Sequence, residues 1–203
     1  FKVPLSLCAR GEISGLSIPL SETNVVCGTT TSQMFQLTLD LGAMSIDVGH
    51  PLTEHIFGQH KGVHNGGLTG LDVAVRKPLV VSTGVDSSVR VFNVSGRKCE
   101  LSKFFKEDAV SIAVHPMGTF LAVGFSDKLK VCSVLVDDIR VEAAFSIKSC
   151  REVRFSNGGH LIAAVTQNGV QIFSAVTHTH VATLRGHVGQ VKAIAFSRDD
   201  RRL

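Results

Sequence analysis

The feature that most constrains the fold is a repeat with a period of 41 residues. Asp86, Asp127 and Asn168 stand 41 positions apart. Apolar residues keep the same step at two further places in the unit, namely Val73, Val114, Phe155 and Phe196, and Val80, Leu121, Ile162 and Leu203. Self-similarity at ~40–45 residues is typical of the four-stranded blades of a β-propeller. We therefore expect an all-β chain whose core is built from repeated blades.

Each repeat is interpreted as four short strands. In the clearest unit we expect strands at 70–75, 79–84, 89–94 and 99–105. Arg76-Lys77-Pro78 and Asp86-Ser87-Ser88 form the turns between them. Short β-branched runs bounded by Gly, Pro, Asp and Ser are strand and turn signals, and no run is long or periodic enough to predict a helix.

The period divides the chain into blades at about 12–63, 64–108, 109–149 and 150–187, with 188–203 as an incomplete fifth blade. The first blade is the most divergent, with a long outer strand and connection over 40–63. The fifth begins with a strand expected at 191–196 and a turn at 197–200. Propellers typically have four to eight blades. We therefore expect a fragment of a larger propeller.

The pattern resembles the WD-repeat family of β-propellers. In that family a Gly-His pair precedes the first strand, an Asp lies in the turn between the second and third strands, and Trp-Asp ends the third strand. Gly186-His187 matches the first pair and His64 matches it in position. The turn position is held by Asp86, Asp127 and Asn168. The resemblance implies a seven-bladed, tandem propeller in which these five side chains, His64, Asp86, Asp127, Asn168 and His187, are structural blade positions.

The Trp of the family pattern is absent from every unit. Phe92, Cys132 and Phe173 stand in its place. A His-to-Asp hydrogen bond inside a blade can therefore form, but its link to Trp cannot. We expect degenerate blades whose fold is specified by strand pattern and spacing.

The sequence predicts no catalytic, cofactor-binding or metal-binding residues. His60 and His64, or His178 and His180, offer two ligands at most, whereas zinc sites need three or four. The glycine-rich run at 65–70 lacks the Lys-Ser/Thr of a phosphate loop and precedes a strand. No nucleophile stands with a placed base, so enzyme activity is not expected.

Charge and hydropathy exclude further classes. The net charge of +4 is mild and the basic residues are scattered, which does not predict the concentrated basic face of a nucleic-acid-binding protein. No apolar stretch reaches ~18 residues, so no membrane span is expected. Five cysteines without a Cys-x-x-Cys motif favour a reducing compartment, and we expect a cytoplasmic protein.

Longer strings resemble one family within the WD-repeat proteins. They include 70–79, 122–129, Val-Asp-Asp-Ile-Arg at 136–140 and Phe-Ser-Asn-Gly-Gly-His-Leu at 155–161. They are similar to the axonemal family of cilia- and flagella-associated protein 57, and the similarity covers about 65–203. Several of these strings go beyond what propeller folding requires.

The resemblance implies a non-enzymatic scaffold on the cytoskeleton of the cilium or flagellum. Its implied partners are inner-arm dynein subunits, regulatory-complex or other axonemal scaffold proteins, and doublet microtubules. It supplies no protein-binding residue. Two alternatives stay open, namely a propeller that binds the microtubule lattice directly and a general cytosolic WD-repeat adaptor.

Overall fold

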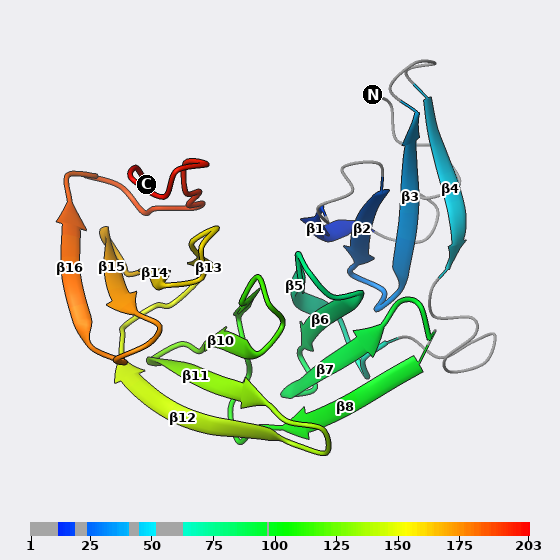
Figure 1. Cartoon of the computed structure of the whole chain (residues 1–203), viewed down its shortest axis with the longest axis horizontal. Helices are drawn as coiled ribbons and strands as arrows, with labels where there is room; N and C mark the ends of the chain where they lie inside the picture. The colour runs from blue at the N-terminus through cyan, green and yellow to red at the C-terminus, as the bar shows by residue number, and fades with distance from the viewer. Residues whose placement is uncertain (1–11, 19–23, 41–44, 52–62, 97) are drawn as a thin grey trace.

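The computed structural model describes residues 12–18, 24–40, 45–51, 63–96 and 98–203 (Figure 1). Within these ranges the regular elements are sixteen β-strands, and no helix occurs among them. Accordingly, the described part of the chain has no helix that could cross a bilayer. The all-β expectation is confirmed.

The strands form four sheets of four antiparallel strands each, paired in chain order. The first sheet contains β1 (Ile13–Ser17), β2 (Asn24–Thr29), β3 (Met34–Asp40) and β4 (Ser45–Pro51). The second contains β5 (Leu68–Val73), β6 (Leu79–Gly84), β7 (Ser88–Asn93) and β8 (Lys98–Phe104). The third contains β9 (Ser111–Val114), β10 (Phe120–Gly124), β11 (Lys128–Val134) and β12 (Ile139–Ser146). The fourth contains β13 (Val153–Phe155), β14 (Leu161–Val165), β15 (Gly169–Ser174) and β16 (His180–Arg185).

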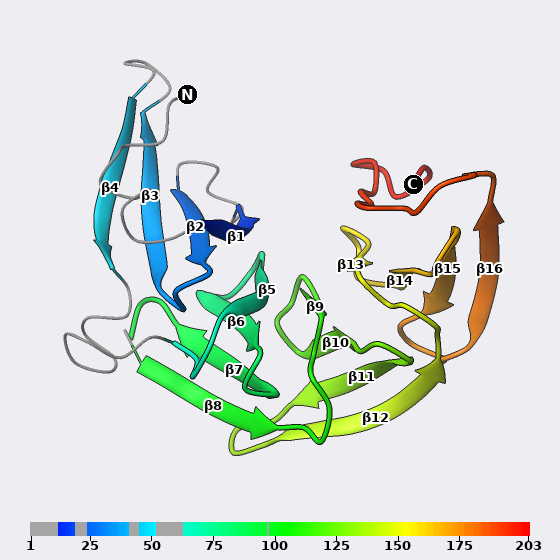
Figure 2. The same ribbon diagram turned by 180° about the vertical axis from the view of Figure 1, so that it is seen from behind.

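The four sheets fan around a common centre as the blades of a propeller (Figures 1 and 2). The first strand of each sheet lies toward the centre and the fourth lies at the outside. Contacts join β1 to β5, β5 to β9, and β9 to β13, so consecutive blades touch along their inner strands. The propeller architecture predicted from the period is confirmed.

The 41-residue period is also a period in hydrogen-bond geometry. The turns after β5, β9 and β13 are each closed by an N–H···O bond of 2.9 Å, from Ala74 to Leu79, His115 to Phe120, and Ser156 to Leu161. The turn at 197–202 has the same bond, from Ser197 to Arg202. Gly118 and Gly159 lie inside two of these turns with φ of 66° and 78°, a region that favours glycine. Asp200 takes the corresponding place in the last turn with φ of 55°.

The hydrophobic core lies between neighbouring sheets. One buried cluster joins the first and second sheets, a second joins the second and third, and another joins the third and fourth. Every residue of β9 is buried, as are four of the five residues of β10. β9 and β10 are covered on both faces, which explains why Leu121-Ala122-Val123 of β10 is a continuous apolar run.

The sequence predicts a strand at 191–196, but residues 186–203 contain no strand in the structure. In the four complete sheets the inner strand pairs with the second strand of its own sheet. Within residues 186–203 there is no second strand with which 191–196 could pair. Val191, Ile194 and Phe196 nevertheless pack on the outer face of the fourth sheet, partly buried.

Replacing Phe125 with alanine should destabilise the protein by about 3–5 kcal/mol, because the ring is fully buried between the second and third sheets and its removal leaves a cavity. The matched control is Phe104→Ala, since that ring is 66% exposed, and its effect should be close to zero. Urea unfolding of both variants measures the difference. Equal losses from the two variants would contradict the core assignment.

Candidate functional site

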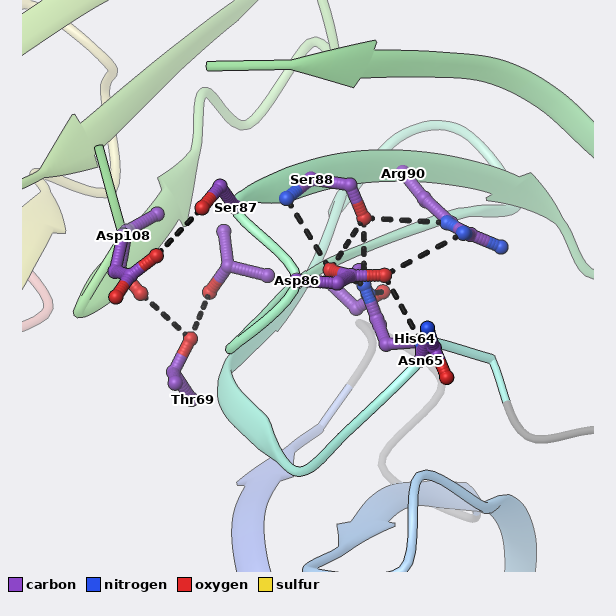
Figure 3. A network of polar contacts seen from close by, with 11 residues as sticks. His64, Asn65, Thr69, Asp86, Ser87, Ser88, Arg90 and Asp108 are labelled. Carbon is purple, nitrogen blue, oxygen red and sulfur yellow. Dashed lines mark hydrogen bonds and ion pairs between the residues drawn. The ribbon is translucent and has the colours of Figure 1, made fainter. Parts of the chain in front are cut away.

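His64 is the centre of a buried polar network just before the second sheet (Figure 3). Its Nδ1 atom lies 2.9 Å from Asp86 Oδ1 and its Nε2 atom lies 2.7 Å from Ser82 Oγ. The Asp86 carboxylate only accepts hydrogen bonds, so we assign the proton to Nδ1 and the acceptor role to Nε2. The imidazole thereby joins the start of the blade to β6 and to the turn between β6 and β7.

Asp86 also holds this turn closed. Its carboxylate accepts hydrogen bonds from the Asn65 N–H at 2.9 Å and from the Ser88 hydroxyl at 2.7 Å. Arg90 Nη2 approaches at 3.5 Å. Gly84 gives the imidazole its room, because a Cβ atom there would lie 2.5 Å from His64 Cγ. The network therefore depends on four segments of the blade at once. They are the residues before β5 (His64 and Asn65), the end of β6 (Ser82 and Gly84), the turn at Asp86, and the start of β7 (Ser88 and Arg90).

Burial determines the proton equilibria of the pair. Burial lowers the pKa of His64, although the neighbouring Asp86 carboxylate acts in the opposite direction. For Asp86, burial acts to raise the pKa, but hydrogen bonds from Ser88, Asn65 and His64 outweigh it and hold the pKa at about 2. Neutral imidazole beside ionised carboxylate is therefore the folded form.

The third sheet lacks this network. Phe105 stands 41 positions after His64, and its ring packs against Phe125 with a centroid distance of 5.4 Å. Asp127 therefore has no imidazole partner, and its side chain is 67% exposed and 3.8 Å from Lys128. The turn acid is present in this blade, but its partner has become an aromatic ring.

The fourth sheet lacks it in another way. By the 41-residue period Ser146 and Asn168 stand at the steps of His64 and Asp86, whereas backbone pairing puts the buried Ile147 in the place of Phe105. Asn168 and His187 are both exposed, and both line an open cavity of about 570 Å³ in the crevice between the third and fourth sheets. Among the described residues no hydrogen bond joins Asn168 to His187.

Side chains at the place of the missing Trp belong to the core. Phe92, Cys132 and Phe173 are 2%, 0% and 3% exposed. Burial raises the pKa of the Cys132 thiol to about 12, so this thiol is protonated and unreactive at neutral pH. Apolar contact replaces the hydrogen bond that an indole would make.

A second polar centre, at Asp72 on β5, lies on the propeller axis. Its carboxylate accepts hydrogen bonds from Ser17 Oγ at 2.9 Å and from the Val114 N–H at 2.8 Å. Arg154 Nη1 lies 3.5 Å away, and Arg154 Nε donates to Glu152 Oε1 at 3.0 Å. Asp72 therefore contacts the innermost strand of every other described sheet.

Burial raises the pKa of Asp72, opposed by the Val114 N–H, the Arg154 guanidinium and the Ser17 hydroxyl. Together Asp72 and Arg154 line a cavity of about 450 Å³ at the centre of the four sheets. The sequence reasoning missed this pair. Its signal was two opposite charges, exactly two repeats apart in otherwise apolar inner strands.

The histidines considered as metal ligands do not form a cluster in the described part of the chain. There, no group of three or more His, Cys, Asp and Glu side chains is placed to hold a metal ion. His178 lies in the turn before β16, and His180 Nε2 lies 2.9 Å from the Thr183 hydroxyl. His60 lies outside the described residues.

Comparison with known proteins supplies relatives but no family model, since none matches the sequence. The chain is 34% identical over 194 residues to cilia- and flagella-associated protein 57 of Mus musculus. It is 32% identical over 210 residues to protein 57 A, and 31% identical over 150 residues to protein 57 C, both of Tetrahymena thermophila.

These alignments cover 96%, 98% and 68% of this chain but only 15%, 16% and 12% of the three relatives. The chain thus corresponds to a small part of much longer proteins. The resemblance inferred from the sequence strings is confirmed, and the four-bladed arrangement agrees with a WD-repeat propeller.

Asp86→Ala should cost about 1–3 kcal/mol of stability, because it leaves the buried Nδ1–H of His64 without its carboxylate acceptor. Asp127→Ala is the matched control one repeat later, and its effect should stay within about 0.5 kcal/mol because that side chain is exposed. Chemical denaturation of both variants gives the comparison. A loss from Asp127→Ala as large as that from Asp86→Ala would refute the assigned difference.

Acidification should weaken the fold through His64. Its folded pKa lies below the ordinary value of 6.5, so the unfolded chain takes up the proton first as the pH falls. The stabilisation is complete above pH 6.5 and is lost below it, by at most about 1.4 kcal/mol per pH unit for one proton. Unfolding free energies at several pH values, for the natural chain and His64→Asn, test this. The variant should lose less stability between neutral and mildly acidic pH than the natural chain.

Proposed function

This chain is homologous to cilia- and flagella-associated protein 57 over nearly all of its length, and we propose that it is part of a non-enzymatic scaffold of the ciliary axoneme. The proposed role is to dock or assemble inner dynein arms and regulatory-complex components on doublet microtubules. The observation that carries the proposal is the similarity over 96–98% of this chain to proteins named for cilia and flagella.

The use of buried polar groups supports a scaffold. His64 and Asp86 close one blade, while Asp72 and Arg154 join the inner strands of several. These polar side chains are engaged in holding the sheets together. The turns and the outer strands are left to meet partners, which suits a rigid disc with several binding faces.

The second candidate, direct binding to the microtubule lattice, is favoured by the positive net charge of +4. Attraction to an acidic protein surface would be weakened by added salt. Co-sedimentation of the purified protein with bare microtubules at low salt favours this candidate over the scaffold role. Absence of co-sedimentation favours docking through other axonemal proteins.

Deleting this propeller segment from the full-length protein should reduce particular inner dynein arms and leave the doublets intact. The reason is that a scaffold positions its clients without forming the lattice itself. Electron tomography of cilia from the deletion strain gives the measurement, with a strain carrying the restored full-length protein as control. Normal inner-arm content after the deletion would contradict the proposal.

Cross-linking mass spectrometry of native cilia identifies the partners independently. Lys106, Lys148 and Lys192 are exposed and can react. Cross-links from them to dynein or regulatory-complex subunits support the scaffold role, whereas cross-links to tubulin alone support lattice binding. Absence of the protein from cilia would overturn both.

A further inference from the structure

The cavity between the third and fourth sheets arises from a change of side-chain size at fixed places in the repeat. Side chains from three positions of the repeat unit lie at this place. Backbone pairing aligns Gly84 and Arg90 of the second sheet with Phe125 and Lys130 of the third and with Thr166 and Gln171 of the fourth. It also aligns Phe105 of the third sheet with Ile147 of the fourth. The imidazole of the second sheet reaches directly over Gly84.

In the third sheet the same place is filled by hydrocarbon. The rings of Phe105 and Phe125 meet edge to face, and Lys130 Nζ lies 5.0 Å and 4.6 Å from their centroids. Phe125 is fully buried. Packed rings therefore fill this place in the third sheet.

In the fourth sheet Ile147 and Thr166 take the places of Phe105 and Phe125, and a cavity of about 570 Å³ lies beside them. Pockets that hold ligands usually measure about 300–1,000 Å³. The stacked rings of Phe145 and Phe173, 4.4 Å apart, fill the crevice next to it. The cavity therefore sits on a packed base and opens to solvent.

The lining of this cavity combines apolar surface, including Ile147, with polar groups and two cations. Ser146, Thr166, Asn168, Gln171 and Thr183 supply hydroxyl and amide groups. Lys148 and Arg185 supply positive charge, and neither forms an ion pair within the described part of the chain. No carboxylate lines the cavity, and the neighbouring Asp127 side chain is in contact with Lys128.

We propose that this crevice binds an acidic peptide segment of a protein partner. The carboxylates of the segment meet Lys148 and Arg185, and its peptide groups hydrogen-bond with the amides and hydroxyls of the lining. Thr183 and Arg185 lie on one face of β16, opposite Gln171 and Gly169 of β15, so they present a regular row to an extended chain.

A peptide fits this chemistry better than a nucleic acid. Single-stranded nucleic acids are held by aromatic side chains on which bases stack, and no Phe lines this cavity. Two fixed cations are also fewer than a backbone-tracking groove provides. The inference rests on the proposed role as a protein-binding scaffold and assigns that role a surface.

Fluorescence anisotropy with the purified full-length protein tests the proposal. The probes are labelled hexaglutamate, hexaglutamine and an oligothymidylate of similar length. We expect hexaglutamate to bind at least tenfold more tightly than hexaglutamine and more tightly than the oligothymidylate. Its binding should weaken between about 0.05 M and about 0.5 M salt.

Two kinds of variant locate the site. Lys148→Glu with Arg185→Glu should weaken hexaglutamate binding at least about tenfold, since two exposed attractions become repulsions. Ser146→Phe leaves the charge unchanged, places a ring in the lining of the cavity, and should also abolish binding. The matched control is Lys106→Glu, which reverses an exposed lysine at the corresponding place one blade earlier.

The proposal is overturned if hexaglutamate binds no better than hexaglutamine, or if Lys106→Glu weakens binding as much as the double variant. Tighter binding of the oligothymidylate would replace it with nucleic-acid binding. Far-ultraviolet circular dichroism verifies that each variant is folded. These outcomes are separate from the ciliary role, because the binding assay requires no axoneme and the deletion experiment requires no acidic peptide.

Discussion

The carboxylate of Asp72 is the contact on which the relative placement of the four sheets depends. It receives a hydrogen bond from Ser17 of the first sheet and one from the Val114 N–H of the third, and it pairs with Arg154 of the fourth. A buried carboxylate is costly unless it is paired and hydrogen-bonded. Any relative shift of the sheets would leave it unsatisfied, so it selects one arrangement among the many that apolar packing alone permits.

Around this centre the repeat keeps its backbone geometry while its side chains vary. Backbone geometry recurs unchanged, as the four 2.9 Å turn bonds at 41-residue intervals show. Side chains at equivalent positions of the repeat can differ, because the crevice between two blades can be filled either by side chains or by water. The place held by Phe105 in the third sheet is held by Ile147 in the fourth, and a neighbouring place is held by Gly84, Phe125 and Thr166 in successive sheets. A degenerate repeat is therefore a frame whose crevices can differ in chemistry.

Much of the fold could be predicted from the sequence, because strand and turn signals are local. β6, β10 and β14 have the bounds that their apolar runs indicate. The strand expected at 191–196 failed because a strand needs a partner, which is not a property of its own residues. The Asp72–Arg154 pair and the emptiness beside Ser146 depend on which blades are neighbours in space. Reading them from sequence would have required comparing every step of the period across the units, instead of searching for one recurring motif.

The same reasoning explains why the departures from the family pattern are informative. Where the pattern is complete, as at His64 and Asp86, its polar groups satisfy one another and offer little to a partner. Where Phe105 replaces the imidazole, the crevice is closed by packing. Where Ile147 and Thr166 stand in place of the rings of Phe105 and Phe125, the blade keeps an unfilled crevice, and there the nearby charges are Lys148 and Arg185. Binding capacity in such a propeller follows from the loss of an internal network at a place where the backbone frame is retained.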